Sequence, residues 1–360
     1  MKRLTDPDRG AINVILNHSN HVHERPFKLS KKHSLFQRIP YRNILDGVGN
    51  TPIIRLNKMA AGLKAEIFAK LEFLNPMGSI KDRIAKYMIE KAEKEERIKP
   101  GDTIIDNSSG NTALGLAMVC SVKGYKVKMI VRDSLSLEKI KFLRAMNVEL
   151  VMIDHTLPPE SPNSYNNITP RIVRETKGGY YFDQHNNREN NETHYTMTGP
   201  EIWKQMEGKI DYFVAGIGTG GTICGVSKYL KEKDPKIKVI GVDPVGSIFY
   251  DYFHSKKLVN SSPYYLEGLG DEFLIRCVDF ALIDDIYQIS DKRAFQLTRQ
   301  LADTEVILAG GSSGAAVWAT LRLAKEIDRP ARIVTIFADS ATRYLSTIYN
   351  DDWLREKGFL

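Results

Sequence analysis

The stretch FVAGIGTGGTICGVSKYL, residues 213–230, carries the clearest fold signal of this 360-residue chain. A run of apolar residues typical of a buried strand leads into a glycine-rich turn, and a helical pattern follows. The turn contains four glycines, Gly216, Gly218, Gly220 and Gly221. Backbone N–H groups in such a turn, together with the start of a helix, form a cradle for an anion. The stretch therefore predicts an α/β fold with a phosphate-binding loop, and a tight turn without a ligand is the alternative.

Strand-sized apolar runs alternate with helical periods on both sides of this stretch. AEIFAKL (65–71) and KVKMIVR (126–132) precede it, while KVIGVDP (238–244) and ARIVTIFAD (331–339) follow it. This alternation predicts a mostly parallel sheet covered by helices. A segment rich in Pro, Ser and Asn, residues 155–170, predicts a surface loop. We expect two α/β layers of comparable size, with a ligand cleft between them.

Composition and charge exclude several classes of protein. The net charge is +7, but lysines and arginines are interleaved with acids, so we expect no nucleic-acid partner. The longest apolar runs are strand-sized and no secretory signal begins the chain, so we expect a cytoplasmic protein without a membrane partner. Three widely spaced cysteines, Cys120, Cys224 and Cys277, offer neither a disulfide framework nor a CxxC metal site, and we expect no metal.

Lys81 is the unexpected residue of the stretch NPMGSIKDRIAKYMIEKAE, residues 75–93, which predicts a helix. Ser79 is expected to cap this helix and Asp82 to close a capping box with it. A lysine in the first turn lies against the positive end of the helix dipole, which disfavours an ammonium group. We therefore expect the pKa of Lys81 to be lowered toward that of a neutral, reactive amine.

The glycine-rich turn by itself permits a second interpretation. Gly216, Gly218 and Gly221 match the dinucleotide pattern GxGxxG, and Asp243 ends a strand about twenty residues later, where an acid would meet a ribose hydroxyl. This pattern alone would predict a nicotinamide dehydrogenase. It does not explain Lys81 or the other polar turns.

Two further strand–turn–helix segments have the same small, polar character. In IDNSSGNTALGLAM (105–118), the residues Ser108, Ser109, Asn111 and Thr112 suit the binding of a substrate carboxylate. In LAGGSSGAAVWAT, the segment from Gly310 to Gly314 predicts either a close-packing turn or a further wall of the pocket, and the sequence leaves both interpretations open.

Nine motifs follow one another in order over nearly the whole chain after residue 41. They are GNTPIIRL, NPMGSIKDR, SSGNTALGLA, HYTMTGPEIW, GIGTGGTICG, GVDPVGS, EGLG, GGSSGAA and DSATRYLST. This ordered set resembles the cysteine synthase and cystathionine β-synthase family of fold-type II pyridoxal-phosphate enzymes. The resemblance implies pyridoxal 5'-phosphate, rather than a nicotinamide dinucleotide, as the ligand of the glycine loop.

The same resemblance implies the domain organisation. It predicts a two-domain, three-layer α/β/α fold like that of the tryptophan synthase β-subunit. Residues 1–40 form an N-terminal extension, residues 41–85 and 190–360 form a large cofactor-binding domain, and residues 86–189 form a smaller, mobile domain with the substrate loop. A homodimer is also expected from the resemblance.

The cofactor contacts implied by the resemblance fall on matching motif positions. Lys81 would hold the cofactor and act as the catalytic base, and Asn111 would face its ring hydroxyl. Ser340 would contact the pyridine nitrogen, and a serine there makes the ring a milder electron sink that suits elimination and replacement at the β-carbon. The cofactor phosphate would be held by the loop residues Gly218, Thr219, Gly220, Gly221 and Thr222.

Substrate contacts follow from the resemblance in the same way. The residues expected to bind the substrate are Ser108, Ser109, Gly110, Thr112, Gln184, Gly268 and Asp271. Asp271 resembles the acid of bacterial cystathionine β-synthases and would meet a second amino group, although a solvated loop acid is the alternative. Met77 replaces the usual small residue beside Lys81, so we expect it to narrow the pocket.

The implied reaction is replacement of the β-substituent of serine, or of an O-activated serine, by a thiol through an aminoacrylate intermediate. Cystathionine β-synthase activity, with homocysteine as the nucleophile, is our leading expectation. The alternatives are a cysteine synthase using O-acetylserine and sulfide, and a specialised β-substituted alanine synthase of secondary metabolism. The resemblance is to relatives without a regulatory module, and no cysteine precedes Cys120 to bind haem.

Overall fold

The structure, a computed structural model, describes residues 40–360 except residues 109, 136, 159 and 166. The expected extension, residues 1–40, lies outside the described residues apart from its last position. Residues 41–360 form one compact unit, and this unit contains both sheets described below.

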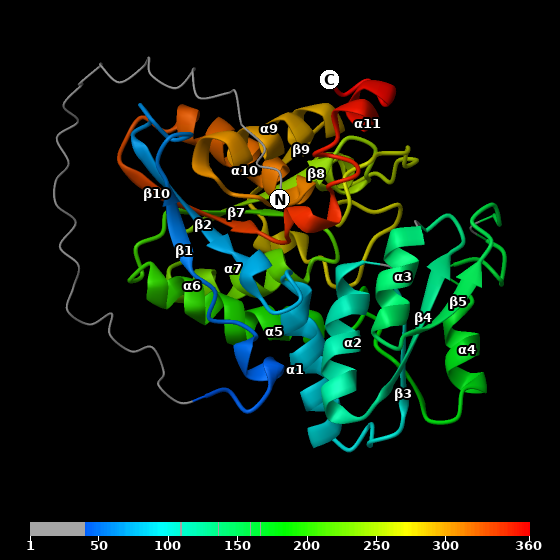
Figure 1. Cartoon of the computed structure of the whole chain (residues 1–360). Coiled ribbons are helices and arrows are strands. Elements are labelled where there is room, and N and C mark those ends of the chain that lie inside the picture. The colour runs from blue at the N-terminus through cyan, green and yellow to red at the C-terminus, as the bar shows by residue number, and fades with distance from the viewer. Residues whose placement is uncertain (1–39, 109, 136, 159, 166) are drawn as a thin grey trace, which may run out of the picture. The chain divides into compact units, whose positions relative to one another are not determined.

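A six-stranded sheet has the strand order β1-β2-β10-β7-β8-β9 (Figure 1). Its strands are β1 (Ile53–Leu56), β2 (Ala65–Leu71), β7 (Tyr212–Gly216), β8 (Lys238–Pro244), β9 (Asp285–Ile289) and β10 (Ala331–Phe337). All neighbours pair in parallel except β1, which is antiparallel to β2. The connection between β1 and β2 is too short for the crossover that a parallel pair needs, which explains this exception.

Helices cover both faces of the six-stranded sheet. Neighbouring residues of β2 point to opposite faces, so Ile67 packs with α9 and α10 whereas Phe68 packs with α6 and α7. The helices of this part are α5 (Glu189–Thr193), α6 (Gly199–Gln205), α7 (Gly221–Lys233), α8 (Phe249–Ser255), α9 (Asp291–Glu305), α10 (Gly311–Glu326) and α11 (Asp351–Glu356). This part is a three-layer α/β/α arrangement, as the sequence predicted.

A second, four-stranded sheet is parallel throughout, with the order β5-β4-β3-β6. Its strands are β3 (Thr103–Asn107), β4 (Lys126–Arg132), β5 (Glu149–Ile153) and β6 (Gly179–Tyr181), and its helices are α1 (Lys81–Lys94), α2 (Asn111–Lys123), α3 (Leu137–Ala145) and α4 (Thr169–Glu175). In β3, Ile104 packs with α1 and α2 while Ile105 packs toward α4. The division into a large and a small domain, with its boundaries at residues 86 and 189, remains a prediction.

Polar turns follow the carboxyl ends of strands from both sheets. β3 ends directly before Ser108, β7 leads into the glycine-rich turn, and β10 is followed by Asp339. The carboxyl ends of parallel strands are where α/β folds bind ligands. The two sheets therefore direct their polar turns toward a common site.

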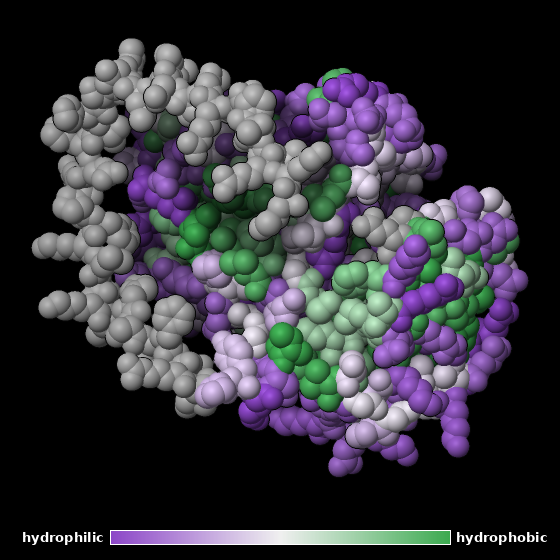
Figure 2. Space-filling view, viewed as in Figure 1, coloured by the Kyte–Doolittle hydropathy of each residue, from purple (hydrophilic) through white to green (hydrophobic). Residues whose placement is uncertain are grey.

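Surface hydropathy varies over the four-stranded part. Figure 2 shows apolar residues gathered over α2 and α3, and Val122, Leu137 and Phe142 are among the exposed apolar side chains of these helices. Among the described residues, no helix combines the length and the apolar character that crossing a membrane requires.

Candidate active site

Lys81 begins α1 and lies in the wall of two cavities that share several lining residues. The smaller cavity has a volume of about 70 Å³ and the larger one about 330 Å³. Gly115 of α2 faces the carbonyl oxygen of Lys81, and an added Cβ there would lie 3.1 Å from that oxygen. The glycine therefore lets α2 pack closely against the start of α1, which fixes the position of Lys81.

Burial lowers the pKa of Lys81 to about 8, because removal from water disfavours its ammonium form. The carboxylate of Asp339 acts in the opposite direction. The sequence predicted the lower pKa from the helix dipole, and the structure adds burial as a cause. A lysine with this pKa exists as a neutral amine in about one molecule in ten at pH 7.

The start of α1 differs from the predicted capping box. The Ser79 hydroxyl accepts a hydrogen bond from the backbone N–H of Lys81 at 3.2 Å. The Asp82 carboxylate accepts from the backbone N–H of Met77 at 2.6 Å, so it closes the preceding turn instead of reaching Ser79. Both side chains hold the segment that precedes Lys81.

The glycine-rich turn before α7 leaves consecutive backbone N–H groups unpaired. Within the described chain, no hydrogen-bond acceptor contacts the N–H groups of Gly218, Thr219, Gly220 or Gly221. Gly218, Thr219 and Gly220 line the smaller cavity. Unpaired N–H groups at the start of a helix attract an anion, so the chemistry of this turn suits a phosphate.

Two glycines of the turn are required by their surroundings. A Cβ on Gly218 would lie 2.3 Å from the Gly268 carbonyl oxygen. Gly220 has φ +82° and a Cβ there would lie 2.7 Å from the Cys277 carbonyl oxygen. Larger residues would push the turn away from the cavity, so the close approach of backbone to ligand depends on these glycines.

Asn111, the first residue of α2, contacts Asp339, which lies just after the carboxyl end of β10. The Asn111 amide donates to the Asp339 carboxylate at 2.8 Å, and the Tyr344 hydroxyl donates to the same carboxylate at 2.7 Å. Asn111 Oδ1 is buried without a partner among the described residues. Burial raises the pKa of Asp339. This polar corner of the smaller cavity has hydrogen-bonding capacity left for a ligand.

Thr112 and Gln184 form one wall of the larger cavity. The Thr112 hydroxyl donates to Gln184 Oε1 at 2.6 Å, which leaves the amide N–H groups of Gln184 as donors. Ser108 and Gly110 line the same cavity. A wall of donors suits a carboxylate.

The wall of the larger cavity carries several charged side chains. Glu267, Asp271 and Glu272 line it, and Lys139 and Glu267 form an ion pair at 2.9 Å. Burial raises the pKa of Asp271 to about 6. Asp271 is therefore ionised near pH 7 and lies in a cavity wall, which favours the ligand-facing interpretation over that of a solvated loop acid.

Most of the predicted site residues surround these two cavities. The smaller one is lined by Lys81, Asn111, Gly218, Thr219, Gly220, Thr222 and Gly268, and the larger one adds Ser108, Gly110, Thr112, Gln184 and Asp271. Gly221 and Ser340 are outside both linings, and the Ser340 hydroxyl accepts from Thr342 N–H at 3.3 Å. Ser109 lies outside the described residues. The roles of all these residues remain predictions.

The segment 310–314 is both a close-packing turn and a part of the cavity wall, the two possibilities that the sequence left open. Ser312 lines the smaller cavity. Gly310 and Gly314 serve close packing, because added Cβ atoms would lie 2.1 Å from Asp339 Oδ1 and from Thr298 Oγ1 respectively.

Met77 differs from expectation: it packs against the apolar core around α1 and α2 and is absent from the linings of the described cavities.

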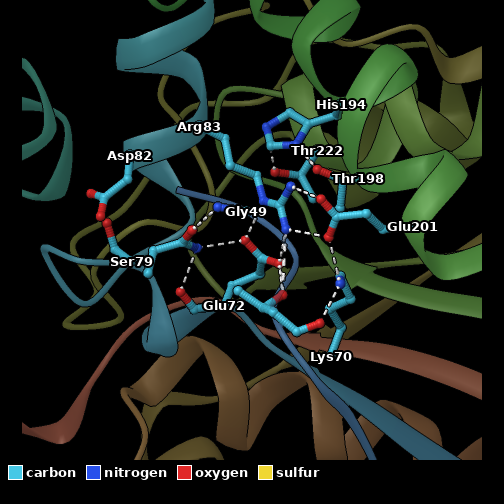
Figure 3. A network of polar contacts seen from close by, with 12 residues as sticks. Gly49, Lys70, Glu72, Ser79, Asp82, Arg83, His194, Thr198, Glu201 and Thr222 are labelled. Carbon is cyan, nitrogen blue, oxygen red and sulfur yellow. Dashed lines mark hydrogen bonds and ion pairs between the residues drawn. The ribbon is translucent and has the colours of Figure 1, made fainter. Parts of the chain in front are cut away.

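A buried network of charges is centred on Arg83, two residues after Lys81 in α1 (Figure 3). Arg83 pairs with Glu72 at 2.6 Å and with Glu201 at 2.7 Å, and Lys70 pairs with Glu201 at 2.8 Å. The side chains of Arg83, Lys70 and Glu72 have no exposed surface. The network ties α1 to β2 and α6, so it holds the helix that presents Lys81.

Three residues of the site were not predicted as such. Asp339 and Glu267 lie inside motifs that the sequence analysis quoted, but the structure was needed to place them beside Lys81. His185 follows Gln184 and lines the larger cavity, and burial lowers its pKa to about 4. Their proximity to recognised motifs was the only available signal.

Comparisons with known proteins agree with this geometry. The family described as "Pyridoxal-phosphate dependent enzyme" matches residues 44–339. The chain is 41% identical to cystathionine β-synthase of Mus musculus over 320 residues, which is 88% of this chain and 57% of that protein. It is 40% identical to cysteine synthase of Staphylococcus aureus over 316 residues, 87% of this chain and 98% of that protein. A solved O-ureido-L-serine synthase, 32% identical, superposes with a TM-score of 0.80 and covers 88% of this chain and all of that one.

The residues present fit the cofactor of this family. Unpaired N–H groups, glycines without room for a Cβ and a buried amide oxygen without a partner surround the cavity beside Lys81. The predicted α/β fold of type II and the predicted cofactor are confirmed by the family match and the superposed structure. The chain belongs to the pyridoxal-phosphate-dependent enzyme family.

Proposed function

We propose that this enzyme is a β-synthase that joins serine, or an O-activated serine, to homocysteine and so forms cystathionine. The observation that carries this proposal is the presence of Asp271 in the wall of the 330 Å³ cavity, which Lys81 also lines. A nucleophile that is itself an amino acid needs such room and a partner for its amino group. Sulfide needs neither.

The residues would share the work as follows. When bound, pyridoxal phosphate supplies the electron sink that makes the α-proton acidic and allows the β-substituent to leave. Lys81, with its pKa lowered by burial, takes the α-proton as a general base and returns a proton at the end of the cycle. The N–H groups of Gly218 to Gly221 hold the phosphate, and Asp339 orients the Asn111 amide.

Substrate binding would use the part of the larger cavity that Thr112 and Gln184 line. The free amide N–H groups of Gln184, fixed by Thr112, donate to the carboxylate of the first amino acid. Ser108 and Gly110 complete the carboxylate site. The ionised carboxylate of Asp271 then receives the ammonium group of the second amino acid.

Two other functions have support of their own. A cysteine synthase is supported by relatives of that name, whose identity of 40% is close to that of the cystathionine β-synthases. A specialised synthase with another nucleophile is supported by the structural likeness to O-ureido-L-serine synthase. All three proposals share the chemistry of β-replacement and differ in the substrates.

Steady-state assays separate these possibilities. Purified protein is given serine or O-acetylserine, each with homocysteine or sulfide, and both cystathionine and cysteine are quantified. We expect cystathionine to be the main product. Cystathionine formation that is negligible beside cysteine formation would reject the leading proposal in favour of the cysteine synthase.

We also propose that the enzyme works as a homodimer in the cytoplasm, in line with the resemblance to its family. Light scattering during size-exclusion chromatography measures the mass of the particle in solution. A mass equal to that of one 40.8 kDa chain would contradict the dimer.

A further inference from the structure

The motif HYTMTGPEIW has no role in the mechanism described so far, yet its first residues form an unusual element. His194–Thr198 is a single π-helical turn between α5 and α6. Such turns are rare and are frequently found at functional sites. The side chains of His194 and Thr198, at its two ends, are both completely buried.

The π-helical turn is packed tightly against α7, the helix that begins at the phosphate loop. A Cβ on Gly225 of α7 would lie 2.3 Å from the Asn191 carbonyl oxygen and 2.8 Å from the Cβ of His194. A Cβ on Gly199 would lie 2.8 Å from the Cβ of Tyr229. Gly225 of α7 and Gly199 of α6 therefore allow the π-helical turn and α7 to pack closely. This packing brings the His194 imidazole near the glycine-rich turn.

The His194 imidazole connects two hydroxyl groups (Figure 3). Its Nδ1 lies 2.9 Å from Thr198 Oγ1, and its Nε2 lies 3.3 Å from Thr222 Oγ1. Thr222 lines the smaller cavity. The imidazole is thus linked to the ligand site through one hydroxyl.

The Thr198 hydroxyl sets the direction of these hydrogen bonds. Within the described chain the Thr198 hydroxyl has no other partner than His194 Nδ1, so its hydrogen is satisfied only by donation to that nitrogen. Nδ1 is then an acceptor, and the neutral ring carries its hydrogen on Nε2. Nε2–H donates to Thr222 Oγ1, and the hydrogen of the Thr222 hydroxyl is left for a ligand in the cavity.

The ring is neutral in this environment. Burial lowers the pKa of His194 well below its ordinary value, and the positive charges of Lys81 and Arg83 act in the same direction. Glu201 acts weakly against them. One nitrogen is therefore free to accept while the other donates.

We propose that His194 is a positioning residue that fixes the Thr222 hydroxyl as a hydrogen-bond donor toward the cofactor phosphate. The proposal rests on the assignment of the loop 218–222 to that phosphate. The relay runs from Thr198 through the imidazole to Thr222, and each member donates to the next. The Thr222 hydroxyl is thereby oriented to donate to a negatively charged acceptor.

The position of the hydrogen on the His194 ring can be measured without the cofactor. Protein labelled with ¹⁵N in histidine is stripped of pyridoxal phosphate, and the two ring nitrogens of His194 are assigned by comparison with a His194 variant. We expect the hydrogen to be on Nε2. A hydrogen on Nδ1 would overturn the proposal, and this result is independent of whether the proposed reaction is correct.

A pair of variants tests the consequence for the phosphate. Glutamine places its amide near the position of Nε2, whereas asparagine places it near that of Nδ1. We expect His194→Gln to keep most of the affinity for pyridoxal phosphate and His194→Asn to lose about tenfold or more, the loss of one hydrogen bond to a charged group. Affinity for pyridoxal, which has no phosphate, serves as the control for folding and should change little in either variant.

Two threonines of the same turn give a matched comparison. Thr198→Val removes the group that sets the ring hydrogen, while Thr196→Val removes a hydroxyl that contacts the backbone oxygens of Glu192 and Thr193 and the hydroxyl of Tyr87, but not His194. Thr198→Val should weaken pyridoxal phosphate binding and Thr196→Val should not. Equal losses in both, or equal losses for pyridoxal and its phosphate, would overturn the proposal; no binding of pyridoxal phosphate by the unmodified chain would instead refute the cofactor site itself.

Discussion

Burial has opposite effects on the two titratable residues that define the chemistry of the site. It lowers the pKa of Lys81 to about 8 and raises that of Asp271 to about 6, because the charged form of each is disfavoured away from water. Lys81 thereby approaches a neutral base, whereas Asp271 keeps its charge at neutral pH. The same physical effect suits one residue to proton transfer and the other to an ammonium group, the roles that we propose for them.

Replacement of Asp271 by asparagine tests its proposed role in the cavity wall. Asp271→Asn removes the charge that, in our proposal, receives the amino group of homocysteine, so KM for homocysteine should rise about tenfold. KM for sulfide, measured on the same preparation, is the control and should stay within about twofold. A parallel rise for both nucleophiles would contradict the assignment.

The pH dependence gives Asp271 a second signature. Its carboxylate is charged above about pH 6, so KM for homocysteine should fall as pH rises through that value. The Asp271→Asn enzyme should lack this change. A fall of the same size in the variant would mean that another group titrates.

Residue roles could be predicted only where a motif carried them. Lys81 and the glycine loop could be singled out as candidates because a lysine at a helix start and several glycines after a strand are locally unusual. Asp339 and His185 look ordinary in the sequence, because their importance comes from neighbours that are distant in the chain. Met77 was misjudged for the same reason: its side chain turns toward an apolar core that the sequence does not reveal.

The glycine-rich loop before α7 has a geometry that tolerates little change. Its turn approaches the segment around Gly268 so closely that one side-chain carbon has no room at Gly218. The strand before it and the helix after it were predicted from local patterns. The antiparallel β1 and the π-helical turn were not, because a short connection and a packed neighbour determine them.

Replacement of Gly218 by alanine tests this element. The added Cβ would lie 2.3 Å from a carbonyl oxygen, so the loop must shift and the protein should lose about 1–3 kcal/mol of stability. Affinity for pyridoxal phosphate, followed by its visible absorption, should fall about tenfold or more. Gly47→Ala is the control, since the nearest atom there is at an ordinary contact distance of 3.5 Å. Equal behaviour of the two variants would contradict the close approach.

The molecule as a whole holds its active lysine through charges that are hidden from solvent. Lys70 and Arg83 would be interpreted as surface residues from sequence alone, yet both are fully buried and paired with Glu72 and Glu201 (Figure 3). Each charge is compensated by neighbours from another element. Such a network depends on long-range packing, which explains why the sequence did not predict it.

Removal of one member should leave an uncompensated charge in the interior. Arg83→Met takes away the main partner of Glu72, and the free energy of unfolding should fall by about 3–5 kcal/mol. The double variant Arg83→Met/Glu72→Gln should regain part of this loss, because the buried carboxylate is neutralised. Urea unfolding measures both, and a loss below about 1 kcal/mol in the single variant would contradict the role of the network.

The central claim of this account is that Lys81 carries the cofactor, and chemical trapping tests it most directly. The purified enzyme with bound pyridoxal phosphate is reduced with borohydride and digested, and the modified lysine is located by mass spectrometry. We predict the pyridoxyl group on the peptide that contains Lys81, and its loss in Lys81→Ala. A pyridoxyl group on a different lysine, with Lys81 unmodified, would contradict the account.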